Sequence, residues 1–184
     1  MGLEILSNSL EDILVRYQRS FSEKAFKKES IELDDLMLTF ELTQEIKAQN
    51  KQYWGRELGT CWQRLIVQIC QSSRHDFSEP IKVGEEDICD IILGNDAIDT
   101  KYRIGSGDSG TLKKFKQYGK KLQNFGYQPI LLILRNDNLP AAIAACKSGG
   151  WKVMQGLHAY NYIQTKTGFN LKKWLQNRKS DFFL

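Results

Sequence analysis

The chain has 184 residues, of which 41% are hydrophobic and 26% charged, and it contains only three prolines. This composition is typical of a folded globular domain and excludes a disordered chain or a collagen-like repeat. The apolar run at residues 130–134 is too short to cross a bilayer, and residues 1–10 lack the pattern of a secretion signal. Four scattered cysteines without metal-binding spacing indicate free thiols. We therefore expect a cytoplasmic protein with no membrane partner.

Positive charge is concentrated in one stretch of the chain. The formal net charge is +4, yet residues 101–121 hold seven basic residues and a single acidic one, Asp108, so the remainder is net negative. Such asymmetry indicates a polyanionic partner. A solvated, lysine-rich helix face is the alternative, and charge alone does not separate the two.

Three helices are predicted in the first part of the chain. Residues 9–22 show apolar positions at helical spacing behind a capping Ser9, and residues 32–50 form a second helical segment. Residues 53–71 show the clearest amphipathic pattern. Its apolar stripe consists of Leu58, Cys61, Trp62, Leu65, Ile66 and Ile69.

From residue 77 the pattern changes to that of strands. Gly94-Asn95 is a hairpin signal that separates the second and third of three predicted strands. The predicted strands cover residues 77–83, 87–93 and 97–104, and a further strand at 129–135 is buried because it has no polar face. A helix at 111–125 lies between the third and fourth strands. The chain continues with a helix at 139–147, a strand at 151–154 and a helical pattern at 160–176 that Gly168 interrupts.

This order of elements predicts a mixed α/β (α+β) fold with a central mixed sheet and a three-strand meander flanked by helices. We interpret residues 1–184 as a single domain. A helical N-terminal extension (1–50) precedes the core (51–135), and a C-terminal helix-strand-helix part (136–184) follows it.

The predicted hairpin brings charged residues together. If Gly94 and Asn95 form the loop, Asp90 lies opposite Asp99, and Lys101 shares their face of the sheet. A loop shifted to Asn95-Asp96 would instead place Asp90 opposite Lys101, which keeps the same cluster. Asp87 is a competing carboxylate, but the alternation places it on the opposite face.

Two carboxylates next to a lysine suit metal-dependent hydrolysis of phosphodiesters. Like charges this close repel unless a cation lies between them, and hard oxygen ligands favour Mg²⁺. We expect Asp90, Asp99 and the Thr100 carbonyl to bind the metal, which would acidify a water molecule and neutralise charge on the phosphate. Lys101 would position or help to deprotonate that water.

Asp90, followed after eight residues by Asp99-Thr100-Lys101, resembles the P-D…(D/E)-x-K motif of the PD-(D/E)XK nuclease superfamily. Cys89 stands where the motif has proline. The resemblance implies a restriction-endonuclease-like core of helix, three-strand meander, helix and strand, matching residues 53–135. It also implies a glutamate from the first core helix, Glu57, as a further catalytic and metal-binding residue.

Residues 101–118 resemble small type II restriction endonucleases, with the ApaLI-like group the nearest. This resemblance implies double-stranded DNA as substrate, a short specific site, 5′-phosphate products, a homodimer and a cognate DNA methyltransferase. Candidate DNA contacts are Arg103, Ser106, Gly107, Ser109, Lys113, Lys114 and Gln117. Tyr102 and Tyr118 are secondary candidates for such contacts.

Other functions remain open from the sequence. A repair or junction-resolving nuclease of the same superfamily and a non-catalytic DNA-binding module both fit the basic stretch. Residues 105–110 also match G-x-G-x-x-G between a strand and a helix, the pattern of a dinucleotide-binding loop. Three features oppose that interpretation: the charged strand before the loop, the lack of an acidic residue in 111–134, and the expectation that this strand is only a hairpin partner.

Overall fold

The computed structural model describes residues 32–105, 107–179 and 182, which belong to a compact unit that begins at Glu32. The helix predicted at residues 9–22 lies outside these residues, as does Ser106. The single helix predicted at 32–50 is wrong, because two short helices occupy this segment: α2 (Asp35–Thr39) and α3 (Gln44–Gln49). The chain turns at Glu41, which has a φ of 52°, and thereby buries Leu42 between the two helices.

The amphipathic pattern at 53–71 is confirmed as helix α4 (Lys51–Ser73), whose N-terminus is capped by Asn50. Five strands then form a mixed sheet in the order β1-β4-β5-β6-β7. Strands β1 (Phe77–Ser78), β4 (Ile91–Leu93) and β5 (Asp96–Lys101) are antiparallel neighbours, whereas β6 (Gln128–Ile133) and β7 (Lys152–Gln155) continue parallel to β5. The mixed α/β class and the mixed central sheet are therefore confirmed.

A small hairpin interrupts the first two predicted strands. Residues 77–83 divide into β1 and β2 (Lys82–Val83), and residues 87–93 divide into β3 (Glu86–Asp87) and β4. Strands β2 and β3 pair only with each other, around a turn at Gly84 with a φ of 65°. Pro80, which has no N–H to donate, separates β1 from β2 and ends the ladder of the large sheet there.

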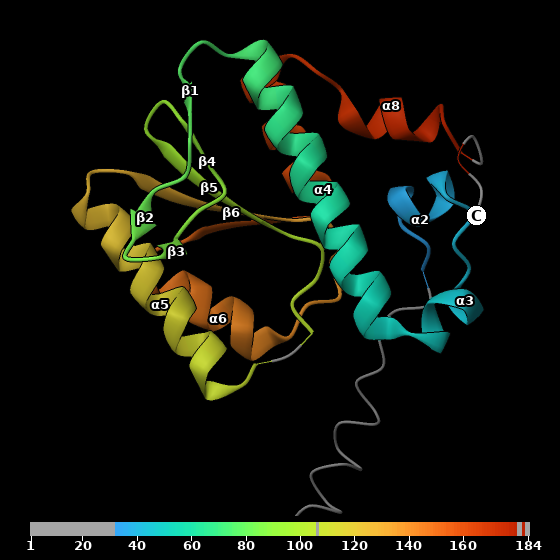
Figure 1. Ribbon diagram of the computed structural model, residues 1–184, viewed down its shortest axis with the longest axis horizontal. Coiled ribbons are helices and arrows are strands. Elements are labelled where there is room, and N and C mark those ends of the chain that lie inside the picture. Colours follow the sequence, from blue (N-terminus) through green and yellow to red (C-terminus); the bar gives the residue numbers. More distant parts are fainter. Residues whose placement is uncertain (1–31, 106, 180–181, 183–184) are drawn as a thin grey trace, which may run out of the picture. The chain divides into compact units, whose positions relative to one another are not determined.

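Helices cover both faces of the large sheet (Figure 1). α4 and α7 (Leu157–Thr167) lie on one face, and α5 (Ser109–Asn124) and α6 (Pro140–Ser148) lie on the other. α8 (Leu171–Gln176) packs against α2. The predicted interruption at Gly168 is confirmed, since this glycine ends α7 in the left-handed conformation. None of the helices in the described ranges is long and apolar enough to cross a membrane.

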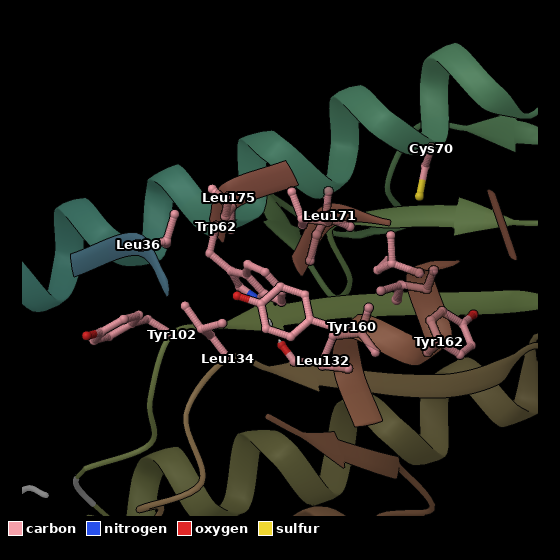
Figure 2. Packing of buried hydrophobic residues seen from close by; sticks show 14 of the residues in the cluster. Leu36, Trp62, Cys70, Tyr102, Leu132, Leu134, Tyr160, Tyr162, Leu171 and Leu175 are labelled. Atoms are coloured by element: carbon pink, nitrogen blue, oxygen red, sulfur yellow. Dashed lines mark hydrogen bonds between the residues drawn. The ribbon is translucent and has the colours of Figure 1, made fainter. Parts of the chain in front are cut away.

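Each face of the sheet has its own core. Under α4, the fully buried Trp62 donates its indole N–H to the Leu132 carbonyl at 3.3 Å and packs edge-on against Tyr160 (Figure 2). On the opposite face, Trp151 donates its indole N–H to the Phe115 carbonyl of α5 at 2.8 Å. Both indole groups are thus satisfied inside apolar layers, which fixes α4 and α5 against the sheet that carries the charged residues.

The close contact between α5 and the chain after α6 predicts opposite effects for two helical glycines. A Cβ at Gly119 would lie 2.2 Å from the Gly149 carbonyl oxygen, whereas a Cβ at Gly55 in α4 would meet nothing within 4 Å. We expect Gly119→Ala to destabilise the protein by about 1–3 kcal/mol. Gly55→Ala should stabilise it by about 0.5–1 kcal/mol, because alanine favours the helix. Urea denaturation of the two variants would measure both free energies, and equal effects would contradict the close packing.

Candidate functional site

The hairpin that carries the charged residues has the first of the two predicted registers. Leu93 pairs with Asp96 and Ile91 with Ile98, around a loop in which Gly94 has a φ of 58°. A loop at Asn95-Asp96 is therefore wrong. The register brings Asp90, at the start of β4, next to the segment of β5 that contains Asp99, Thr100 and Lys101.

Asp90 lies where the ladder between β4 and β5 is displaced. Its backbone N–H donates to the carbonyl of Ile98 at 2.8 Å although Ile91 is the paired residue there, as in a β-bulge. One carboxylate oxygen accepts from the N–H and the hydroxyl of Thr100, both at 2.6 Å. The other accepts from the side-chain amide of Gln63 in α4, also at 2.6 Å.

This bulge corrects the prediction that Asp90, Asp99 and Lys101 project from one face. The contacts with Gln63 and the Thr100 hydroxyl turn the Asp90 carboxylate toward the α4 face of the sheet, whereas Asp99 and Lys101 project toward α5. The three charged groups flank the backbone of β5 from opposite sides. The register alone could not reveal this because a bulge reverses the alternation of side chains.

Asp99 and Lys101 form a close ion pair. The Lys101 ammonium lies 2.6 Å from an Asp99 carboxylate oxygen and donates to the Thr100 carbonyl at 3.1 Å. The Asp99 side chain is only 14% exposed and that of Lys101 is 39% exposed. Burial raises the pKa of Asp99 to about 6, an effect that Lys101 opposes and the charge of Asp90 reinforces. Burial alone would lower the pKa of Lys101, but the charges of Asp99 and Asp90 raise it, so Lys101 remains an ammonium.

The ion pair borders a cavity of about 220 Å³ between the sheet and α5. Asp87 of β3 contributes to this cavity together with Asp99 and Lys101, so its predicted location away from the cluster is wrong. The insertion of the β2–β3 hairpin, which the strand alternation did not include, moves it there. The remaining walls are formed by Ile88, Thr111, Lys114, Phe115, Tyr118 and Trp151.

Two predicted site residues are not brought to this cluster. Glu57 is 44% exposed and pairs with Arg56 at 3.1 Å. Gln63, rather than Glu57, contacts Asp90. It follows Glu57 by six residues, which is about 9 Å along the helix axis. Gln117 is exposed on α5 and does not line the cavity. Gln63 follows Trp62 in the sequence and therefore lies beside the apolar stripe of α4. The sequence does not show which side of this helix contacts Asp90.

The carboxylate and carbonyl oxygens near Lys101 are the candidate ligands of a metal ion. Within the described part of the chain, no three His, Cys, Asp or Glu side chains converge on one point. The cluster does offer oxygen atoms from Asp90, Asp99 and the Thr100 carbonyl, and the Lys101 ammonium already lies against two of them. Mg²⁺ is commonly bound through one or two carboxylates and several water molecules. Asp99 and the Thr100 carbonyl could supply such ligands without Glu57, whereas the Asp90 carboxylate contacts Thr100 from the α4 side of the strand.

Two of the predicted DNA contacts, Arg103 and Lys114, already have carboxylate partners within the protein. Arg103 is mostly buried and forms an ion pair with Asp137 at 3.0 Å, so its predicted contact with DNA is not supported. Lys114 pairs with Glu86 at 2.7 Å, whereas Lys113 is exposed. Gly107 is packed so closely that a Cβ there would lie 2.6 Å from a side-chain carbon of Leu139.

One of the three arguments against a dinucleotide-binding loop is wrong, but the contacts around Asp108 still oppose that interpretation. β5 is the first strand of a parallel β5–α5–β6 crossover, so the argument that it is only a hairpin partner is wrong. Asp108 nevertheless caps α5, and its carboxylate accepts from the N–H and the hydroxyl of Thr111 at 2.9 and 2.7 Å. Ser109 is the first residue of the helix behind this cap. A carboxylate at the helix N-terminus opposes a dinucleotide pyrophosphate by charge and by position.

Comparison of the chain with protein-family models, curated proteins and solved structures gave no significant match. The resemblance to the PD-(D/E)XK superfamily therefore rests on the residues and the element order of this chain. A function for this protein therefore rests on the geometry of Asp90, Asp99 and Lys101.

Proposed function

We propose that the protein is a Mg²⁺-dependent endonuclease that hydrolyses phosphodiester bonds in double-stranded DNA. The observation that carries the proposal is that Asp99 and Lys101 lie together with the Thr100 carbonyl at the edge of a cavity, while Asp90 binds Thr100 from the other side of the strand. These groups supply oxygen ligands for a divalent ion and, beside them, a fixed ammonium that can contact a phosphate.

The order of elements supports the same proposal. Helix α4, the antiparallel strands β1, β4 and β5, helix α5 and the parallel strand β6 follow one another as in the core expected for the PD-(D/E)XK superfamily. The small β2–β3 hairpin is an insertion between the first two strands of this core. Asp90 precedes the central strand of the meander, and Asp99 and Lys101 lie on the next strand, as the motif requires.

In the proposed reaction, water attacks phosphorus in line with the 3′-oxygen. The P–O3′ bond breaks, the 3′-oxygen takes up a proton to become a hydroxyl, the water proton passes to solvent, and the other product ends in a 5′-phosphate. A Mg²⁺ ion held by Asp99 and the Thr100 carbonyl would acidify the water and neutralise charge on the phosphate, and Asp90 would hold Thr100 in position from the other side of β5. Lys101, as an ammonium, donates hydrogen bonds that orient the water and stabilise the negative charge developing on the phosphate oxygens.

Gln63 and Thr100 hold Asp90 in position through three hydrogen bonds of 2.6 Å. Gln63→Leu leaves one carboxylate oxygen without its side-chain donor, and we expect a loss of about 10–100-fold in metal affinity or activity. Titration of cleavage against Mg²⁺ concentration would measure the change. Gln71→Leu, on an exposed position of the same helix, is the matched control, and an equal loss in both variants would contradict a positioning role for Gln63.

We further propose a type II restriction endonuclease that acts as a homodimer at a short specific site and is accompanied by a DNA methyltransferase. This narrower proposal rests on the resemblance of residues 101–118 to small enzymes of that class.

Digestion of phage DNA with and without Mg²⁺ tests both levels of the proposal. Discrete fragments that require Mg²⁺ would support a site-specific endonuclease. Cleavage of branched but not linear duplexes would favour a junction-resolving nuclease, and binding without strand scission would favour a non-catalytic module. The absence of cleavage on every DNA substrate in Mg²⁺ would overturn the proposal.

A further inference from the structure

The β2–β3 hairpin contacts α5 through one carboxylate. Glu86 accepts a hydrogen bond from the Lys114 ammonium at 2.7 Å with one oxygen and from the Tyr118 hydroxyl with the other. Lys114 and Tyr118 are four residues apart and therefore lie on the same side of α5. The pKa of Glu86 is lowered because both groups donate to it.

This anion contact is adjacent to the candidate catalytic cluster. Lys114 and Tyr118 are also walls of the cavity that Asp99 and Lys101 border. Asp87, the residue next to Glu86, lines the same cavity from the hairpin. An anion bound to Lys114 and Tyr118 therefore lies at the wall of the space in which the proposed reaction takes place.

The chemistry of the contact is that of a phosphate site. An ammonium and a hydroxyl that donate to two oxygens of one anion bind a phosphodiester as readily as a carboxylate. The ion pair is exposed, with Lys114 59% and Glu86 54% accessible, and exposed pairs are weak. An incoming phosphate can therefore displace Glu86 without disturbing the core.

We propose that Lys114 and Tyr118 form a binding subsite for a backbone phosphate of nucleic acid, and that Glu86 occupies this subsite in the free protein. The inference rests on the proposed function, because the phosphate belongs to the strand next to the cluster of Asp99 and Lys101. Glu86 thus competes with the substrate for Lys114 and Tyr118.

The test compares two substitutions that change net charge equally. Glu86→Gln removes the competing charge, and Glu85→Gln removes a charge from the neighbouring exposed residue of the same turn. We expect Glu86→Gln to bind a 20-base-pair duplex several-fold more tightly than Glu85→Gln in EDTA, measured by fluorescence anisotropy between 50 and 200 mM KCl. Equal affinities for the two variants would overturn the proposal.

Variants of Lys114 and Tyr118 identify the subsite itself. Lys114→Gln should reduce the slope of log affinity against log salt by about 1, as expected for a lost phosphate contact. It should also cancel the gain of Glu86→Gln when the two are combined. Tyr118→Phe keeps the ion pair and should weaken binding without changing the slope. A gain from Glu86→Gln that persists without Lys114 contradicts the subsite.

A parallel digestion with Mg²⁺ separates this inference from the proposed function. If the wild type cleaves DNA but Glu86→Gln and Glu85→Gln bind with equal affinity, only the proposal of the phosphate subsite is overturned. A Lys114-dependent gain in binding without any cleavage removes the nuclease and keeps the phosphate subsite. The absence of both binding and cleavage removes both.

Discussion

Lys101→Ala is expected to lower the rate of DNA cleavage by about 10²–10⁴-fold while duplex binding persists. The variant loses the ammonium that lies 2.6 Å from Asp99 and that would orient the attacking water. Binding persists because other basic residues, such as the exposed Lys113, still attract the phosphate backbone. Single-turnover cleavage in Mg²⁺ and anisotropy in EDTA would measure the two effects separately.

Lys147→Ala is the matched control for this experiment, because it removes an exposed lysine at the end of α6, away from the cluster. A thermal melt should show that both variants remain folded. Full cleavage by Lys101→Ala would exclude the mechanism, and a loss of binding equal to the loss of cleavage would assign Lys101 to DNA attachment instead.

Asp34→Asn is expected to have the largest effect on stability. Asp34 accepts from the Tyr102 hydroxyl at 2.5 Å and forms an ion pair with Arg135 at 3.1 Å. Lys47, which is 2% exposed, donates to the same Tyr102 hydroxyl at 3.0 Å. Removal of the Asp34 charge takes away one of two carboxylates that pair with Arg135, the other being Asp137 at 2.8 Å, and the carboxylate that accepts from the Tyr102 hydroxyl next to Lys47. We expect a cost of about 3–5 kcal/mol.

Asparagine at position 34 isolates this electrostatic effect. The Asp34 side chain also caps α2 by accepting from the N–H groups of Leu36 and Met37 at 3.1 Å, and asparagine caps a helix equally well. The expected loss corresponds to a melting temperature lower by about 6–20 °C. Glu45→Gln, on an exposed residue of α3, should change the melting temperature only slightly. A melting temperature for Asp34→Asn equal to that of Glu45→Gln would show that the buried charges are not coupled.

The buried network of Asp34, Lys47, Tyr102 and Arg135 also contacts the strands next to the candidate site. Tyr102 directly follows Lys101, and Arg135 follows the end of β6, so the network ties α2 and α3 to the ends of the two strands beside the cluster. Variants that loosen it should therefore reduce cleavage as well as stability, and an active but less stable Asp34→Asn would separate the two roles.

Features that depend on neighbours in the sequence could be predicted well. The apolar stripe around Trp62 indicated α4, Gly94-Asn95 indicated the hairpin with one of two registers, and Gly168 indicated the end of a helix. Each of these is decided by the period of apolar side chains or by the backbone freedom of glycine, both of which act over a few residues.

Features that depend on contacts between distant segments could not. The β2–β3 hairpin was hidden in two strand-like patterns, and its position decides where Asp87 lies. The bulge at Asp90 reverses a side chain whose direction had been inferred from simple alternation. The partners Gln63 and Glu86 come from other elements, and only packing brings them to Asp90 and Lys114.

The sequence by itself determined the mixed α/β class, the presence of the hairpin and the proximity of Asp99 to Lys101, because these follow from local periodicity and strand geometry. The tertiary structure decided which way Asp90 points, that Gln63 rather than Glu57 contacts it, and that Lys114 and Arg103 have carboxylate partners. Those outcomes depend on how helices and hairpins pack across the sheet. That packing is set by the combined shape and charge of segments far apart in the chain.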